Sequence, residues 1–271
     1  MSLLQALILG IIQGITEFFP ISSSGHLAVI PSFLDWPQQP LVFDTSVHLG
    51  TALALLVVFR KEIGNIISSL VKDLSSKGLT FKEYSEDSIF GYKLLIGSIP
   101  AGLIGYFLRD FFENDVRGVL IIVISLLFGS ILMALAEKVQ KKRLLSKDEL
   151  DIKQVFGVGI FQALALFPGV SRSGSTISGG MFLGLNREHA TKFSFLLSIP
   201  IVIAAGLFEI GSSFSNLSSL NYQPLVVGFL ASYGTAIFAI RFLLNFVKSK
   251  SLHPFVLYRV VLALILLTAL F

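Results

Sequence analysis

Apolar segments recur along the whole chain, separated by short polar, glycine-rich or proline-containing stretches. They lie at roughly 3–19, 25–34, 42–59, 91–108, 117–136, 155–167, 174–185, 193–211, 224–247 and 254–271. A helix needs about 20 apolar residues to cross a bilayer, so some of these segments can cross and others are too short. The pattern predicts an all-α integral membrane protein that crosses the membrane several times.

The composition excludes a soluble protein with one anchor. Hydrophobic residues make up 54% of the 271 residues, and charged residues only 14%. A soluble domain usually carries about a quarter charged residues, so most of this surface must face lipid. There are no cysteines, which excludes disulfides, thiolate metal sites and cysteine nucleophiles.

Two pairs of segments, 3–19/25–34 and 155–167/174–185, are each interrupted by a stretch rich in Pro, Gly and Ser. Irregular backbone survives at membrane depth only where it is buried in protein or lines a wet cavity. We therefore predict that each pair forms a re-entrant helical hairpin.

The two halves of the chain resemble each other. Gly10 to Gln13 matches Gly159 to Gln162, and Phe19-Pro20 matches Phe167-Pro168. Each half then holds one hairpin and three transmembrane helices. Because three crossings are odd, the second half is inverted relative to the first, and such repeats place a site at their interface. We expect one membrane domain over 1–271, with repeats at about 1–138 and 154–271 and a cytoplasmic connection at about 139–153.

Positive charge predicts the orientation. The stretches 60–93, 138–153, 187–192 and 241–250 hold 17 of the 21 Lys and Arg residues. Three crossings in each half put all four stretches on one side, which the positive-inside rule makes cytoplasmic. Both termini and the mouth of the first hairpin are then expected on the outer side.

The run from Gln13 to His26 holds the first candidate site. Gln13 and Glu17 are four residues apart and share one helix face. Pro20 ends that helix. The hydroxyls of the following serines then lie at the start of the next short helix, where backbone N–H groups favour anions. These serines are Ser22, Ser23 and Ser24.

The run from Pro168 to Thr176 holds the second candidate site. Arg172 carries a permanent charge and can bind two phosphate oxygens in a fork. It can also pair with Glu17 when the site is empty. The residues around it that can bind a phosphate are Ser171, Ser173, Gly174 and Thr176. The main ionisable groups inside the apolar segments are Glu17, His26 and Arg172. An ionisable side chain inside a membrane is costly, so each of these residues is predicted to have a functional role.

These two runs resemble the signature motifs of the undecaprenyl-diphosphatase family, also called the bacitracin-resistance protein family. The resemblance covers essentially the whole chain. It implies hydrolysis of undecaprenyl diphosphate to the monophosphate, which recycles the carrier lipid for peptidoglycan and other envelope polymers, and it implies bacitracin tolerance. It also implies a multi-pass protein of the bacterial plasma (inner) membrane.

By the same resemblance, the catalytic residues are expected to be Glu17, Ser23, His26 and Arg172, with the other motif residues binding substrate. The resemblance also implies dependence on a divalent cation, Mg²⁺ or Ca²⁺, with Glu17 as a ligand beside the substrate phosphates. Gln13 stands where many members carry Glu, and a glutamine cannot supply a second anionic ligand. Hard cations prefer oxygen ligands and often use substrate phosphates.

Several alternatives stay open at this point. Inverted repeats with broken helices are typical of secondary transporters, so a lipid phosphate flippase is the competing function, with an anion channel as a third class. Either Ser23 or a water molecule can be the nucleophile. Ser23 lies three residues before His26 at a helix start, a spacing that can place the hydroxyl and the imidazole on one face, so His26 would activate Ser23 while Glu17 orients the imidazole. A water molecule would instead use Glu17 or His26 as its general base. The expected partners are a polyprenyl diphosphate lipid and membrane lipids, with no nucleic acid. The sequence leaves the oligomeric state open, and a homodimer is one alternative. Asp44 and His48 are expected to be interfacial polar anchors.

Overall fold

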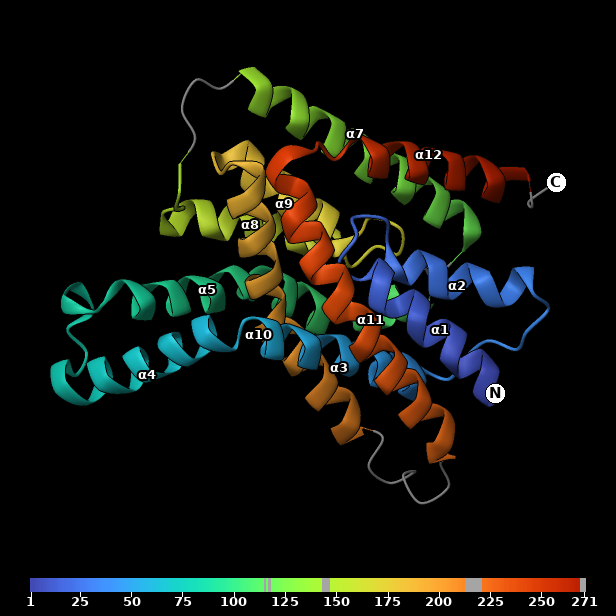
Figure 1. Ribbon diagram of the computed structural model, residues 1–271, viewed down its shortest axis with the longest axis horizontal. Coiled ribbons are helices and arrows are strands. Elements are labelled where there is room, and N and C mark those ends of the chain that lie inside the picture. Colours follow the sequence, from blue (N-terminus) through green and yellow to red (C-terminus); the bar gives the residue numbers. More distant parts are fainter. Residues whose placement is uncertain (115, 117, 143–146, 213–220, 269–271) are drawn as a thin grey trace.

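The computed structural model describes residues 1–114, 116, 118–142, 147–212 and 221–268, and the regular elements within these ranges are helices (Figure 1). They are α1 (Leu3–Thr16), α2 (Ser23–Phe33), α3 (Leu41–Val58), α4 (Arg60–Lys77), η1 (Phe81–Glu83), α5 (Glu86–Phe107), α6 (Arg109–Asn114), α7 (Val119–Lys142), α8 (Ile152–Leu164), α9 (Arg172–Leu183), α10 (Arg187–Ser212), α11 (Tyr222–Ser249) and α12 (His253–Thr268). The predicted all-α class is confirmed.

Five of these helices are long and apolar enough to cross a membrane. They are Leu41–Val58, Glu86–Phe107, Val119–Lys142, Tyr222–Ser249 and the first 22 residues of α10, Arg187–Phe208. The sixth predicted crossing, 254–271, corresponds to α12, a shorter apolar helix of 16 residues. The last three residues of that prediction, 269–271, lie outside the described part of the chain.

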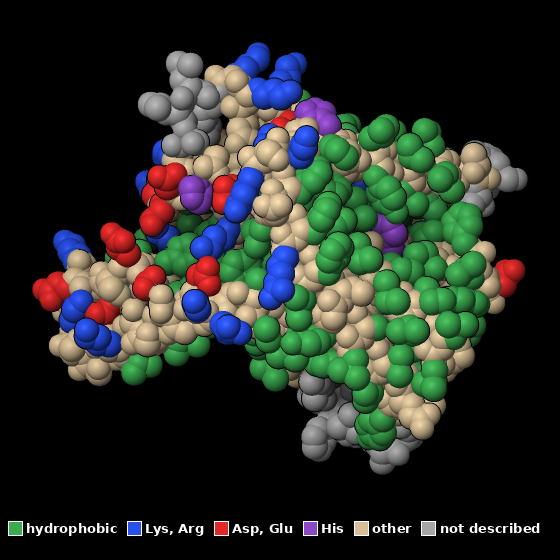
Figure 2. All heavy atoms as spheres, viewed as in Figure 1, with side chains coloured by type: hydrophobic (Ala, Val, Ile, Leu, Met, Phe, Trp, Pro, Cys, Tyr) green, Lys and Arg blue, Asp and Glu red, His purple; other side chains and the backbone are tan. Residues whose placement is uncertain are grey.

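Apolar side chains cover much of the surface, as a lipid-facing protein requires. Leu103 is 53% exposed, Phe107 75% and Phe238 65%. In the view of Figure 2, hydrophobic side chains dominate the right-hand part, whereas charged side chains gather at the left over α4 and α5. The N-terminus and the end of α12 both lie at the right of Figure 1, the first below and the second above.

The charged stretch 60–93, which is expected on the cytoplasmic side, is largely helical. Most of it folds into α4 and the start of α5, which pack against each other. Asp73 joins them, because its carboxylate accepts hydrogen bonds from the Ser85 backbone N–H (2.7 Å) and from the Ser88 hydroxyl (2.7 Å). The bond from Lys77, together with these hydroxyl and backbone donors, holds the pKa of Asp73 below its usual range. α4 is amphipathic: its charged and apolar residues are interspersed, so the sequence contains no continuous apolar run there.

Both predicted hairpins are present as pairs of short helices, α1–α2 and α8–α9, and each packs on a helix from the other half of the chain. α1 lies against α11, and α8 lies against α5. These approaches require glycine, because a Cβ on Gly14 would lie 1.9 Å from Thr235 Oγ1 and one on Gly159 would lie 2.5 Å from the Gly97 carbonyl oxygen. Close backbone contact through small residues is typical of helix pairs in membranes.

Candidate active site

The breaks in the two hairpins have the same local structure. Ser22 and Ser171 both have positive φ, at 75° and 74°, a backbone conformation that residues other than glycine rarely adopt. Each caps the short helix that follows: Ser22 Oγ accepts the Gly25 N–H (3.3 Å), and Ser171 Oγ accepts the Gly174 N–H (3.2 Å). Strained backbone that recurs in two places is held by its surroundings and often marks a functional site.

Glu17 links the two turns. Its Oε1 accepts a hydrogen bond from Arg172 Nη2 at 2.6 Å. Its Oε2 accepts hydrogen bonds from Ser23 Oγ at 2.7 Å and from Gln13 Nε2 at 3.1 Å. The two oxygens therefore differ: one binds the permanent cation of the second motif, and the other contacts the hydroxyl of the first. Four residues singled out from the sequence thus form one connected group.

His26 does not make the contact expected from its spacing. The three-residue separation suggested that its imidazole faces Ser23, with Glu17 orienting the ring. Instead, Nδ1 lies 2.7 Å from the Ser22 carbonyl oxygen, and Nε2 lies 2.7 Å from the Tyr258 hydroxyl. The Tyr258 ring also stacks on the imidazole, with centroids 5.7 Å apart. A carbonyl only accepts, so Nδ1 carries the proton, and a neutral ring then accepts from Tyr258 at Nε2.

His48 was expected to be an interfacial anchor, yet its Nε2 lies 3.7 Å from Glu17 Oε2. Its Nδ1 pairs with the Asp44 carbonyl oxygen at 2.7 Å. This contact depends on how α3 packs against the first hairpin, which spacing along the chain does not reveal.

The other motif residues surround Arg172. Its Nη1 donates to the Ser194 carbonyl at 3.4 Å, and the Thr176 hydroxyl hydrogen bonds to the Arg172 carbonyl and the Ser194 hydroxyl. Ser173 Oγ donates to the Phe19 carbonyl at 3.3 Å, which ties the second turn to the first. Ser173 and Thr176 are fully buried with these partners, so their contacts fix the guanidinium and the turn.

A cavity of about 740 Å³ opens beside the first turn. Ser24 and His48 line it together with Pro168 of the second turn. Most of its remaining wall is apolar and comes from α2, α3 and α10, including Leu27, Leu49 and Val202. A polar end and an apolar wall suit an amphiphilic ligand with a small polar headgroup.

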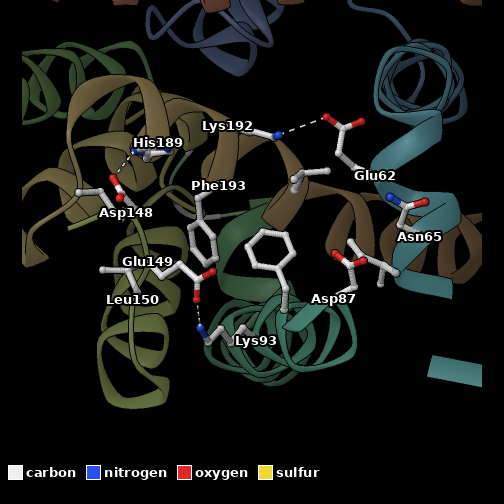
Figure 3. Close-up of a pocket in the computed structure, with 14 residues that line it drawn as sticks. Glu62, Asn65, Asp87, Lys93, Asp148, Glu149, Leu150, His189, Lys192 and Phe193 are labelled. Atoms are coloured by element: carbon white, nitrogen blue, oxygen red, sulfur yellow. Dashed lines mark hydrogen bonds and ion pairs between the residues drawn. The ribbon is translucent and has the colours of Figure 1, made fainter. Parts of the chain in front are cut away.

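A second cavity, of about 330 Å³, contains none of the predicted site residues (Figure 3). It lies among α4, α5, α10 and residues 148–150. Two ion pairs join its walls in the described part of the chain, Lys93–Glu149 at 3.0 Å and Lys192–Glu62 at 3.2 Å, and His189 Nδ1 lies 3.5 Å from Asp148. Because these groups already pair with one another, this cavity is a weaker site candidate than the first.

Two buried ionisable residues were not among the predicted site residues. Glu137 is fully buried and receives a two-point hydrogen bond from Arg187, at 2.7 and 2.6 Å. Arg259 is also fully buried. Arg259 lies inside the apolar segment 254–271, where a charge is costly and indicates a function, whereas Glu137 lies just beyond the segment 117–136 and carries no such signal.

Glu17 and the residue beside it, Gln13, have oxygen atoms that suit part of the coordination shell of a hard cation. Gln13 is fully buried, and its Oε1 has no hydrogen-bond partner among the described residues. A neutral oxygen beside a carboxylate is a suitable pair of ligands for Mg²⁺ or Ca²⁺. The described residues contain no cluster of three or more His, Asp or Glu side chains that could hold a metal ion by themselves, so substrate phosphates would have to complete the shell.

Comparison with known proteins identifies the family. The profile described as "Bacitracin resistance protein BacA" matches residues 6–265. The chain is 39% identical to the undecaprenyl-diphosphatase of Idiomarina loihiensis over 98% of both chains. It is 41% identical to the undecaprenyl-diphosphatase of Rubrobacter xylanophilus, over 97% of this chain and 96% of that one. The predicted resemblance is therefore confirmed, and the chain belongs to the BacA family of bacitracin resistance proteins.

Proposed function

We propose that this chain hydrolyses undecaprenyl diphosphate to undecaprenyl phosphate and inorganic phosphate. The observation that carries the proposal is the Glu17 carboxylate, which contacts Ser23 on one oxygen and Arg172 on the other. A base, a hydroxyl and a phosphate-binding guanidinium are thereby joined beside a cavity that suits a lipid. The names of the relatives support the same substrate. The reaction recycles the carrier lipid for peptidoglycan and other envelope polymers, and it confers bacitracin tolerance.

The diphosphate binds between the two turns. Arg172 exchanges its contact with Glu17 for the phosphate oxygens, which it can hold in a fork. The starts of α2 and α9 present backbone N–H groups, which favour an anion. Ser22, Ser24 and Ser171 add hydroxyls at these starts. The isoprenoid chain leaves along the apolar wall of the larger cavity, past Leu27 and Val202.

Two nucleophiles remain in competition, and the contact between Ser23 and Glu17 favours the serine. Ser23 Oγ attacks the terminal phosphorus while its proton moves to Glu17 Oε2. The O–P bond to Ser23 forms, the phosphoanhydride bond breaks, and undecaprenyl phosphate leaves. Water then attacks the phosphoserine, phosphate leaves, and the proton on Glu17 returns to Ser23 Oγ. In the alternative, water attacks the diphosphate directly, with Glu17 or His26 as the general base.

A divalent cation, Mg²⁺ or Ca²⁺, completes the site in this proposal. Glu17 and Gln13 Oε1, which has no hydrogen-bond partner among the described residues, would hold it together with the substrate phosphates. The cation would neutralise part of the phosphate charge, which is the main requirement of phosphoryl transfer.

The site opens to the outer face of the bacterial plasma membrane in this proposal, with the two halves forming an inverted repeat. The grouping of charge over α4 and α5, opposite the N-terminus and the end of α12, supports that orientation (Figure 2). The matching turns at Ser22 and Ser171, and the packing of each hairpin on the other half, support the repeat. The chain is treated as one membrane domain, part of whose central connection, 143–146, lies outside the described residues.

The decisive experiment measures two activities of the purified protein. The phosphatase proposal expects release of inorganic phosphate from undecaprenyl diphosphate in detergent, with loss of release in Glu17→Gln. A flippase would instead move a labelled lipid phosphate across vesicles without releasing phosphate. Transport without hydrolysis would overturn the proposed function.

A further inference from the structure

Arg259 of α12 contacts the turns of both hairpins. It is fully buried. In the described part of the chain it donates to four main-chain carbonyls and one hydroxyl. These contacts are Pro20 (3.3 Å), Ser125 (3.3 Å), Leu126 (3.0 Å), Gly169 (2.8 Å) and Ser130 Oγ (3.2 Å). A buried guanidinium with this set of acceptors is unusual, because buried charges normally pair with opposite charges.

Two of these carbonyls belong to the turns that carry the site. Pro20 lies between α1 and α2, and Gly169 lies between α8 and α9; in the described ranges, no turn or loop backbone N–H donates to either carbonyl. Such groups are expensive to leave unpaired at membrane depth. One guanidinium satisfies both: Nη1 binds the first turn and Nη2 binds the second.

The same side chain also fixes both turns to α7. Nε and Nη2 both donate to the Leu126 carbonyl, and a Cβ on Gly129 would lie 2.2 Å from Nη2 and 2.6 Å from the Val170 carbonyl oxygen. The absence of a side chain at Gly129 therefore creates the space in which the guanidinium and the second turn meet α7.

We propose that Arg259 is a positioning residue, which sets the distance between the turn that carries Ser23 and the turn that carries Arg172. This inference rests on the proposed function for its catalytic consequence. Ser23 follows Pro20 by three residues, and Arg172 follows Gly169 by three. A shift of either turn therefore moves the nucleophile relative to the bound phosphate. Misplacement by about 1 Å can cost about a hundredfold in rate.

The test replaces Arg259 with lysine. Lysine keeps the charge, but its single ammonium group cannot bind the carbonyls of both turns and of α7 at the same time. Arg259→Lys is expected to lower kcat for phosphate release about 10- to 100-fold per folded molecule, with little change in KM. Arg241→Lys, at an exposed arginine of α11, is the matched control and should behave as wild type. Gly129→Ala keeps the arginine but fills its space, and it is expected to lower kcat in the same way.

A physical readout separates positioning from stability. The chain has no cysteines, so spin labels can be placed at Ser32→Cys on α2 and Phe156→Cys on α8. The distance distribution between them should be narrow with Arg259 and broader or shifted with Arg259→Lys. A normal kcat and an unchanged distance in folded Arg259→Lys would show that the arginine only stabilises the fold. If wild-type protein releases no phosphate, the proposed function fails, while the label distances still decide the positioning role.

Discussion

Arg172 Nη2 lies 2.6 Å from Glu17 Oε1, although the two residues are 155 positions apart in the chain. The guanidinium is 14% exposed and the carboxylate 7%. Two charges removed from water in this way stabilise each other, and removal of one leaves the other unpaired. A ligand that replaces Glu17 as the partner of Arg172 must itself be an anion, and a diphosphate meets this requirement.

Arg172→Lys is expected to lose about a hundredfold or more in phosphate release, because an ammonium cannot bind two phosphate oxygens in a fork. The protein should still fold, since lysine retains the charge opposite Glu17. Turnover of purified protein should be compared with that of Lys192→Arg, a conservative change on α10 away from the turns. Near-normal turnover in folded Arg172→Lys would contradict the assignment of Arg172 as the phosphate clamp.

Removal of divalent cations should abolish phosphate release, and Mg²⁺ or Ca²⁺ should restore it. Gln13→Glu is expected to lower the cation concentration needed for half-maximal rate, because it adds a second carboxylate beside Glu17. The measurement is a cation titration of wild type and variant after treatment with a chelator. Full activity in the chelator would contradict the cation requirement, and an unchanged titration would exclude Gln13 as a ligand.

The sequence predicted the two turns well, because Pro20 and Pro168 break helices that are otherwise apolar. It also offered the pairing of Glu17 with Arg172 as a second role for the arginine in the empty site, since isolated charges at membrane depth have few partners. The orientation of His26 was not predictable in the same way. Spacing along one helix cannot reveal Tyr258, which reaches the imidazole from a helix more than 200 residues later. The contact of His48 with Glu17 likewise depends on the packing of α3 against the first hairpin.

The topology predicts opposite labelling of two exposed serines. Ser32 lies near the C-terminal end of α2, and Ser76 lies near the end of the charged helix α4. In intact cells, Ser32→Cys should react with an impermeant thiol reagent, whereas Ser76→Cys should react only after the membrane is opened. Two further positions considered for this test, Ser146 and Ser215, lie outside the described residues. Labelling of Ser76→Cys from outside would invert the proposed orientation.

Asp73 should make the stability of the α4–α5 contact depend on pH. The bonds from Lys77, Ser85 and Ser88 lower its pKa in the folded protein. This stabilisation is therefore fully present above the ordinary aspartate pKa of about 4 and is lost as pH falls through the lower folded value. The difference in melting temperature between wild type and Asp73→Asn should be constant at neutral pH and shrink in acid. A difference that does not change with pH would contradict the role of the ionised carboxylate.

Ser23→Ala tests the nucleophile, and the contact with Glu17 makes the expected result specific. Ser23 Oγ is 2.7 Å from Glu17 Oε2, whereas both His26 ring nitrogens are occupied elsewhere. If Ser23 attacks, Ser23→Ala removes the nucleophile and should reduce phosphate release by far more than tenfold. His26→Ala should then cost less than Glu17→Gln, because the base beside the serine is Glu17. General-base help is worth about 10²–10⁴ in rate, which sets the expected loss for Glu17→Gln.

The serine mechanism also predicts a covalent intermediate. Rapid quenching of wild-type protein with substrate labelled in the terminal phosphate should trap label on Ser23, and Ser76→Ala on α4 is the control that retains it. A Ser23→Ala protein that binds lipid normally and keeps more than about a tenth of the activity has lost less than about 1.4 kcal/mol of barrier stabilisation. That loss is too small for a missing nucleophile, so water attack with Glu17 or His26 as the base would then be the mechanism.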